Sequence, residues 1–358
     1  GALLGGRARG GRGGAGRRGL ATMPRAVGSA GLSSLPEELI IRICSSLDCR
    51  SLASMENSCC RFRSLVRSGR LWRNLCTSSY ECLRDFFEDR NGIYKCSELR
   101  VPDVTHSEHI LFKRLARDVM LATEQADQEI SLQALIRCAV EATTTDHAEE
   151  SVQNVLSRET RVSRSFYNLC YWSSKGSESC THSDAITFQL SHPLSVVRCI
   201  KIRPFEAHFQ RGSPIYSSAF VRFSFGTGRC ETRDLVEITD ETEPGGAQDA
   251  VNEGWSEISD VYPMEQVNAL QTFEIPPTLC CGGFVRIELL GKKQKQDIDG
   301  LYYVCLSHVQ VTGVPLSNFG MVQDAEEAVS IPLLHYDPPP FSCEKATKQN
   351  LEPEAMEY

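Results

Sequence analysis

The sequence lacks the features of a membrane protein, a nucleic-acid-binding protein and a disulfide scaffold. No window approaches the roughly 20 apolar residues that a membrane span needs. The 46 acidic residues outnumber the 38 basic ones, and the formal charge of −8 argues against a general phosphate-binding surface. The 16 cysteines are scattered along the chain without a Cys-x-x-Cys spacing, which is typical of reduced thiols. We therefore expect a cytoplasmic or nuclear protein that binds neither nucleic acid nor membrane.

Motifs of common catalytic and metal sites are also missing. The sequence contains no Gly-x-Ser-x-Gly, no His-Glu-x-x-His and no P-loop. His106 and His109 could share a helical face near Cys96, but a fourth metal ligand is not evident. Asp297 and Asp299 resemble part of a calcium loop without its other oxygen ligands, so a turn between strands is the expected structure. We expect no catalytic residue, no metal and no cofactor.

Both ends of the chain have compositions that do not favour a packed core. Residues 1–31 contain six arginines, eleven glycines and no acid, which predicts disorder, although an organellar transit peptide is an alternative. The chain starts at Gly1 and Met23 comes later, so the upstream residues could be a fragment or a mispredicted extension. Residues 317–358 carry eight acids and two lysines, and we expect a mostly disordered, acidic tail.

Residues 35–76 carry the most informative pattern, because two apolar series there have helical spacing. Pro36 suits a first helical turn, and Glu37 and Glu38 suit the positive end of a helix dipole. Roughly 40 residues lie near the lower size limit for independent folding, so we expect a bound partner to complete the core. The apolar series are Leu35, Leu39, Ile40, Ile43 and Leu47, then Leu52, Met55, Phe62, Leu65, Val66, Leu71, Trp72 and Leu75.

This stretch resembles the F-box. The resemblance rests on Leu35-Pro36, Leu47-Asp48, Cys59 ahead of Arg61-Phe62-Arg63, and the closing segment 71–76, in this order and at family spacing. Ser58 and Cys60 depart from the usual pattern, and an ordinary helical hairpin inside a larger domain is the alternative.

An F-box docks a substrate receptor on the Skp adaptor of a cullin–RING ubiquitin ligase. The resemblance therefore implies a non-catalytic subunit of an SCF-type E3 ligase, whose partners are a Skp-type adaptor and a protein target. The residues expected to bind the adaptor are Leu35, Pro36, Leu39, Ile40, Ile43, Leu47, Leu52, Cys59, Phe62, Leu71 and Trp72.

The rest of the chain divides by the period of its apolar residues. The F-box occupies residues 32–79, and residues 80–160 keep a helical spacing that predicts an α-helical bridge. Residues 161–316 alternate with a period of two, as at Ile186, Phe188 and Leu190, which predicts an antiparallel β-sandwich or jelly roll able to fold without the F-box. The predicted fold class is thus α+β and multidomain.

The β region carries a second resemblance. Its alternation and its closing strand at residues 309–313 resemble galactose-binding-like, discoidin-type sandwiches. The segments 170–174, 202–210, 212–217 and 299–304 look like those of plant F-box proteins with such a C-terminal domain. This likeness covers most of residues 35–316 and implies architecture and an adaptor role, but no substrate.

The long loop at residues 204–217 is the predicted target-binding surface. Arg203, His208, Arg211 and Tyr216 lie in or beside it, where aromatic and arginine side chains can anchor a partner. We interpret the chain as an F-box substrate receptor. A lectin-like module that binds a glycan or peptide, with an F-box that serves assembly, is the alternative, and an enzyme acting on carbohydrate comes third. Aromatic residues that could instead plug the ends of the sandwich are Trp172, Phe205 and Phe209.

Overall fold

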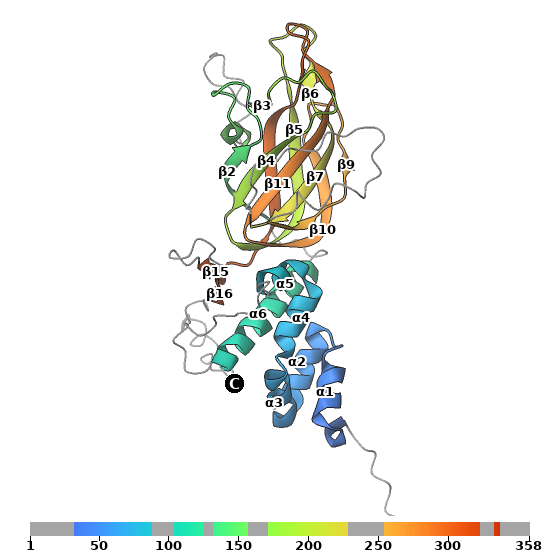
Figure 1. The fold of residues 1–358 in the computed structure, drawn as a ribbon, viewed down its shortest axis with the longest axis vertical. Coiled ribbons are helices and arrows are strands. Elements are labelled where there is room, and N and C mark those ends of the chain that lie inside the picture. The colour runs from blue at the N-terminus through green and yellow to red at the C-terminus, as the bar shows by residue number, and fades with distance from the viewer. Residues whose placement is uncertain are drawn as a thin grey trace, which may run out of the picture.

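The computed structural model describes residues 32–87, 104–124, 132–156, 171–227, 254–322 and 333–336. Helices lie at one end of this elongated arrangement and stacked β-sheets lie at the other (Figure 1). An N-terminal helical region followed by an antiparallel β-sandwich confirms the predicted fold class. The prediction of disorder for residues 1–31 lies outside the described residues.

The helices begin where the sequence supplies a cap or a suitable backbone angle. They are η1 (Leu32–Ser34), α1 (Glu37–Cys44), α2 (Cys49–Ser58), α3 (Cys60–Ser68), α4 (Leu71–Ser79), α5 (Glu81–Phe87) and α6 (Val104–Glu124). Pro36 stands before α1 with a φ of −55°. The Asp48 carboxylate accepts a hydrogen bond from the Ser51 backbone N–H at 2.7 Å and so caps α2. Arg70 has a φ of 49°, and this left-handed residue turns the chain from α3 into α4.

The helices share one apolar core. Ile40 of α1, Trp72 of α4 and Leu115 of α6 are each at most 1% exposed and belong to the same buried cluster. α4 packs against both α5 and α6. The expectation that residues 35–76 need an external partner to complete their core is therefore wrong, because later helices of the same chain supply the missing apolar surface.

Two antiparallel sheets form the sandwich (Figure 1). The first sheet has the order β1 (Gln133–Ala134), β14 (Cys305–Pro315), β5 (Leu194–Glu206) and β10 (Gln271–Cys281), with β3 (Trp172–Ser173) on β14 and β6 (Ile215–Tyr216) on β5. The second has the order β2 (Ile136–Ala142), β4 (Asp184–Leu190), β11 (Phe284–Lys292), β7 (Ser218–Gly226) and β8 (Trp255–Ile258), with β9 (Tyr262–Pro263) on β7. A hairpin of β12 (Gln294–Lys295) and β13 (Tyr302–Tyr303) extends beyond the sheets, and η4 (Val152–Leu156) packs beside β2.

The inward residues of both sheets form the sandwich core, as the alternation predicts. Phe188 of β4, Phe223 of β7 and Val311 of β14 are fully buried in one cluster. Where β14 closes on β5, a Cβ on Gly313 would lie 2.1 Å from the Val196 carbonyl oxygen. Glycine at this position therefore permits the register shift between Thr312 and Gly313 that completes the pairing.

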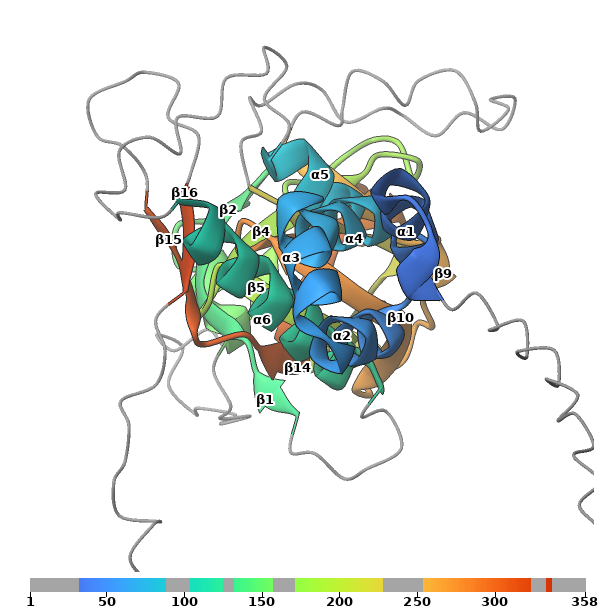
Figure 2. The ribbon, with the colours of Figure 1, turned by 90° about the horizontal axis from the view of Figure 1, so that it is seen from below.

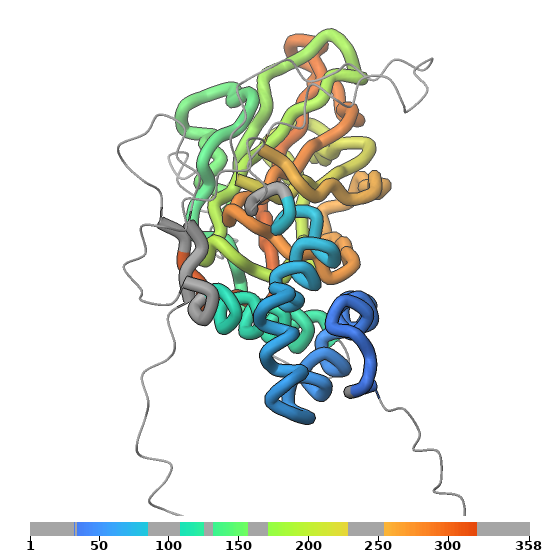
Figure 3. The backbone as a smooth tube through the Cα atoms, turned by 60° about the horizontal axis from the view of Figure 1, so that its bottom comes forward, coloured from blue at the N-terminus to red at the C-terminus, as the bar shows by residue number. Residues whose placement is uncertain are grey.

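The helical region covers one end of the sandwich directly (Figures 2 and 3). Leu194 and Val196 of β5 and Leu279 of β10 are buried in the helical core rather than in the sandwich core. The Cys82 Sγ of α5 also contacts the Leu279 carbonyl oxygen at 3.5 Å. The two halves thus meet through a shared apolar interface.

The predicted helical bridge over residues 80–160 is wrong in its second half. α6 ends at Glu124, and residues 133–142 form β1 and β2 at the edges of the two sheets. β2 pairs with β4 through two register shifts, and such shifts interrupt the two-residue alternation that marks a strand. The series Leu132, Leu135, Ile136 and Val140 has a helix-like spacing because it mixes the fully buried Leu135 with the exposed Leu132 and Val140. The sandwich therefore begins at Gln133 and not at residue 161.

The prediction of a mostly disordered tail from residue 317 is wrong for part of that segment. β15 (Phe319–Val322) pairs with β16 (Leu333–Tyr336) in an antiparallel hairpin. Phe319 is 2% exposed and joins the helical core, because burial of this ring outweighs the acidic composition of the surrounding segment. The rest of the tail lies outside the described residues.

Candidate functional site

The first candidate site is an exposed apolar strip on α1, in the half of the molecule away from the sandwich (Figure 1). Leu39 and Ile43 lie four residues apart and are 48% and 39% exposed, whereas the neighbouring Ile40 is fully buried. Leu32 and Pro36 extend the exposed strip. Leu32, Pro36, Leu39 and Ile43 are called the α1 face below. A helix that is apolar on its inner side and also exposes aliphatic residues is typical of a protein-binding helix.

The predicted adaptor-binding residues fall into two groups. Side chains on or near the surface are the exposed Pro36, Leu39, Ile43 and Cys59 and the half-buried Leu35 and Leu47. The others, at most 8% exposed, are Ile40, Leu52, Phe62, Leu71 and Trp72. For this second group the prediction of direct adaptor contact is wrong, because the side chains lie inside the helical core and shape the α1 face only through the fold.

A buried charged network explains why Trp72 faces inward. Glu56 of α2 is 3% exposed, and its carboxylate accepts hydrogen bonds from the Trp72 indole at 3.0 Å and from Lys113 at 2.8 Å. The His109 ring nitrogen lies 2.8 Å from the second carboxylate oxygen. Burial would raise the pKa of Glu56, but the hydrogen bonds from Lys113, His109 and Trp72 outweigh it and hold the pKa below its ordinary value. The network joins α2, α4 and α6.

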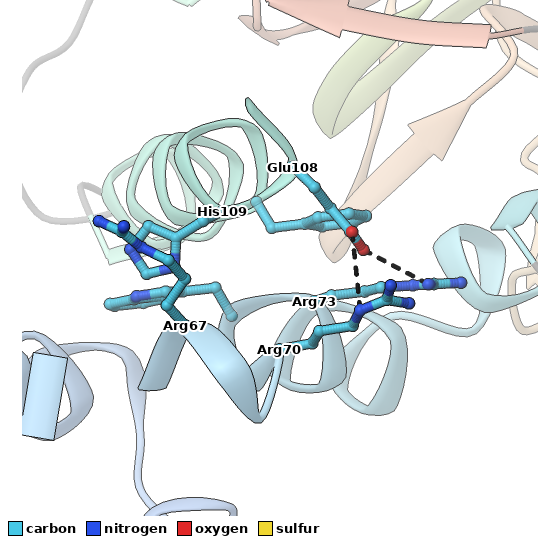
Figure 4. A pocket seen from close by; sticks show the side chains of 7 residues that line it. Arg67, Arg70, Arg73, Glu108 and His109 are labelled. Carbon is cyan, nitrogen blue, oxygen red and sulfur yellow. Dashed lines mark hydrogen bonds and ion pairs between the residues drawn. The ribbon is translucent and has the colours of Figure 1, made fainter. Parts of the chain in front are cut away.

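A small hollow beside this network is lined by side chains of α3, α4 and α6 (Figure 4). Glu108 lies between Arg73, at 3.4 Å, and Arg70, at 3.8 Å, while Arg67 lies on the other side next to His109. Arg70 and Arg73 thus share Glu108 as their partner, whereas Arg67 lies apart from them in this view. The arrangement neutralises Glu108 where α6 crosses the F-box helices and does not form an anion-binding cradle.

The second candidate site is the end of the sandwich farthest from the helices, near β6 (Figure 1). The Gln266 side-chain amide donates to the Ile215 carbonyl oxygen at 2.8 Å and to the Gln294 side-chain oxygen at 3.0 Å. The Asn268 amide donates to Glu206 at 2.8 Å. These bonds join the segment 265–270 to the hairpin 294–303 and to Glu206 and Ile215, which flank the loop 207–214. The loop, the segment and the hairpin are together called the distal surface below.

The distal surface exposes large apolar side chains. Phe209 is 66% exposed and Ile298 is 87% exposed, with Val267 and Leu270 near 38%. Behind them lies a small aromatic cluster in which Tyr216 and Tyr303 meet edge to face, with ring centroids 6.3 Å apart. The exposed residues thus stand on a packed support, which lowers the entropy lost when a partner binds.

The structure separates the predicted target-binding residues. His208 and Arg211 are exposed in the loop 207–214, as predicted. Tyr216 is 3% exposed and burial raises its pKa to about 12, so the prediction of a direct target contact is wrong for this residue. Arg203 lies on β5 and is half-buried, with an enclosed Nε that has no hydrogen-bond partner. The loop itself is shorter than predicted because β5 continues to Glu206.

Sequence reasoning left one residue of the distal surface open and missed another. Phe209 was considered either as a recognition residue or as a plug of the sandwich, and Ile298 received no role. Ile298 stands between Asp297 and Asp299 in a turn, and an aliphatic residue in such a polar setting is a signal of exposure. Lys292, in a cluster of lysines, is by contrast fully buried and pairs with Asp184 at 2.9 Å.

The described residues contain no group of three His, Cys, Asp or Glu side chains that could hold a metal ion. His109 pairs with Glu56, and the Asp299 carboxylate accepts a hydrogen bond from the Tyr303 hydroxyl at 2.6 Å. Every cysteine in the described ranges is a free thiol, and burial raises the pKa of Cys76, Cys280 and Cys305 to about 12. None of the helices in those ranges is long and apolar enough to cross a membrane.

Comparison with known proteins identifies the family of the chain. The F-box-like family matches residues 32–78, which include the α1 face. The F-box protein At4g00755 from Arabidopsis thaliana is 32% identical over 292 residues, which cover 78% of this chain and 74% of the relative. The chain belongs to the F-box protein family. The sequence-based resemblance to plant F-box proteins is thereby confirmed.

Solved structures resemble the β region of this F-box protein. CBM32-3 from a family 31 glycoside hydrolase of Clostridium perfringens is 12% identical and covers 49% of this chain and 90% of its own, with a TM-score of 0.31. The C-terminal domain of a Bacteroides fragilis chitobiase is 12% identical and covers 51% of this chain and 98% of its own, with a TM-score of 0.33. At this similarity the likeness concerns the fold alone and gives no ligand.

Proposed function

We propose that this F-box protein is a substrate receptor of an SCF-type ubiquitin ligase, which binds a Skp-type adaptor through the α1 face and a protein target through the distal surface. The observation that carries the proposal is the α1 face itself. Leu39 and Ile43 remain exposed after the chain has completed its own helical core. Exposed aliphatic residues on a helix backed by a packed core are typical anchors for a partner.

The proposed role is positioning rather than catalysis. A receptor raises the effective concentration of a target lysine beside an activated ubiquitin held elsewhere in the assembly, which needs geometry but no catalytic residue of its own. The proposal involves no cofactor, nucleic acid or membrane. It requires that the protein and the adaptor share a cytoplasmic or nuclear location.

Adaptor binding can be tested on the α1 face without disturbing the core. Leu39→Ala with Ile43→Ala should weaken adaptor binding by roughly 2 kcal/mol or more, because each side chain loses its contact area with the partner. Val261→Ala is the matched control, since Val261 is 49% exposed in the sandwich half. Titration calorimetry with purified adaptor measures the difference. Wild-type affinity in a folded double variant would place the interface elsewhere.

The target side of the proposal is supported by the composition of the distal surface. Phe209 and Ile298 present apolar area on separate loops, while His208 and Arg211 add polar contacts beside Phe209. The Ile298 side chain has no ring face to stack on a sugar, whereas it can enter an apolar pocket of a protein. These features favour a protein target over the lectin-like alternative.

Proximity labelling with and without proteasome inhibition can test the target side. Target proteins should be enriched by the wild-type chain, accumulate when the proteasome is inhibited, and disappear with Phe209→Ala and Ile298→Ala while adaptor recovery stays normal. Equal target recovery by the wild-type chain and the variant would exclude the distal surface as the target-binding site. Saturable binding of galactose to the full chain, without ubiquitination of any enriched protein, would favour the lectin-like alternative.

A further inference from the structure

α6 is fixed by charged and polar contacts in its first half and at its end. In the first half, His109 and Lys113 contact the buried Glu56 of α2. At its end, the guanidinium of Arg198 on β5 donates from Nη1 to the Ala122 carbonyl oxygen at 3.2 Å and to the Thr123 carbonyl oxygen at 3.0 Å. The helix therefore connects the F-box core with a strand of the sandwich.

The Arg198 contact satisfies a requirement of the helix terminus. The last four carbonyl groups of an α-helix have no partner within the helix, and a cation at this end interacts favourably with the helix dipole. α6 ends at Glu124, so Ala122 and Thr123 lie in its last turn. Since Arg198 belongs to β5, one side chain provides both the cap of α6 and a directional link between the two halves.

The hydrogen bonds of Arg198 depend on orientation more strongly than the apolar contacts at the same interface do. Leu194, Val196 and Leu279 hold the sandwich against the helices by burial, which has little orientational preference. Hydrogen bonds weaken steeply when their angle changes, so the two bonds from Arg198 restrict rotation of one half against the other.

We infer that Arg198 is a positioning residue that fixes the orientation of the sandwich, and with it the distal surface, relative to the α1 face. The functional part of this inference rests on the proposed function, because orientation matters most when ubiquitin must reach a target lysine. The structural part concerns the free protein and can be tested without a partner.

Hydrogen exchange of the full chain tests the structural part. Arg198→Gln should raise the exchange rate of the last-turn amides of α6 by about tenfold, since charge-assisted hydrogen bonds to the carbonyls are lost. Amides of β11 should not change. Arg198→Lys should restore part of the protection because it keeps a cation at the helix terminus. Arg114→Gln is the matched control, because Arg114 is an exposed arginine of the same helix. Unchanged exchange in Arg198→Gln would overturn the inference.

Self-ubiquitination in the reconstituted ligase tests the positioning role. The wild-type chain should be modified on a restricted set of its lysines, mapped by mass spectrometry, and Arg198→Gln should spread modification over more lysines while adaptor affinity stays within about twofold. An unchanged lysine pattern despite faster exchange would show that Arg198 is structural only and overturn the positioning role. If the wild-type chain fails to bind the adaptor, the proposed function fails, while the exchange experiment still decides whether Arg198 fixes the junction.

Discussion

The two ends of this protein expose apolar side chains in different ways. On the α1 face, Leu39 and Ile43 lie on a regular helix whose opposite side is buried in the helical core. On the distal surface, Phe209 and Ile298 lie in a loop and a hairpin that side-chain hydrogen bonds of Gln266 and Asn268 help to join. A helix repeats its geometry every turn, so its exposed face can be recognised from spacing, whereas a loop surface depends on contacts between distant segments.

The largest effect is expected when the sandwich is expressed without the helices. A fragment of residues 161–316 lacks β1, β2 and the fully buried Leu135 between them, and it uncovers Leu194, Val196 and Leu279. We now expect this fragment to show no cooperative thermal transition by circular dichroism, contrary to the expectation from the sequence alone. The matched control is residues 32–322, which retain both the edge strands and the helical cap. A cooperative, strand-rich melt of the short fragment would show that the two halves are energetically independent.

The next largest effect is the loss of stability on alanine substitution, which should differ between buried and exposed residues of the F-box. Trp72→Ala should lower the free energy of unfolding by about 3–5 kcal/mol, because it opens a cavity and leaves Glu56 without its indole donor. Ile43→Ala should change it by only about 0.5 kcal/mol, since Ile43 lies on the surface. Urea unfolding measures both variants. Similar stability losses would mean that α1 does not present Ile43 to solvent.

These contrasts explain which parts of the fold were predictable. The helix around Ile40 and the strand at Ile186 and Phe188 were predicted correctly because each element is regular and repeats its geometry along the chain. β2 was predicted as helix because its register shifts interrupt the alternation. The inward position of Trp72 follows from Glu56, a residue whose partners on α4 and α6 cannot be inferred from local spacing.

The candidate sites are also limited by what local spacing can reveal. Leu39, Ile43, His208 and Arg211 are exposed, as their proposed roles require, and those roles stay predictions. Tyr216 was misassigned because an aromatic residue beside a loop looks the same in sequence whether it supports that loop or faces solvent.

A pH-dependent effect is expected from the buried Glu56 of the helical half. The pKa of Glu56 lies below its ordinary value of 4.5 in the folded protein. The stability it contributes is therefore present above the unfolded pKa and is lost as the pH falls through the folded pKa. Glu56→Gln should be less stable than wild type at neutral pH, by roughly 3 kcal/mol, and the difference should shrink below about pH 4.5. Thermal melts from pH 7 to pH 3 measure it. A difference that stays constant with pH would contradict this role of the carboxylate.

The smallest effect on stability belongs to the distal surface. Phe209→Ala and Ile298→Ala should each change the free energy of unfolding by less than about 0.5 kcal/mol, because both side chains are mostly exposed. Chemical unfolding of the two variants checks this. A large loss for Phe209→Ala would mean that its 6.2 Å contact with Phe205 holds the aromatic cluster together.

The most direct test of the account compares adaptor affinity across the two ends. Purified adaptor is titrated against the wild-type chain, the Leu39→Ala/Ile43→Ala variant and the Phe209→Ala/Ile298→Ala variant. We predict that the α1 variant loses at least about 30-fold in affinity, the equivalent of 2 kcal/mol, whereas the distal variant binds as wild type does. Equal affinity of all three folded chains, or loss of adaptor binding by the distal variant alone, would contradict the assignment of separate functions to the two ends.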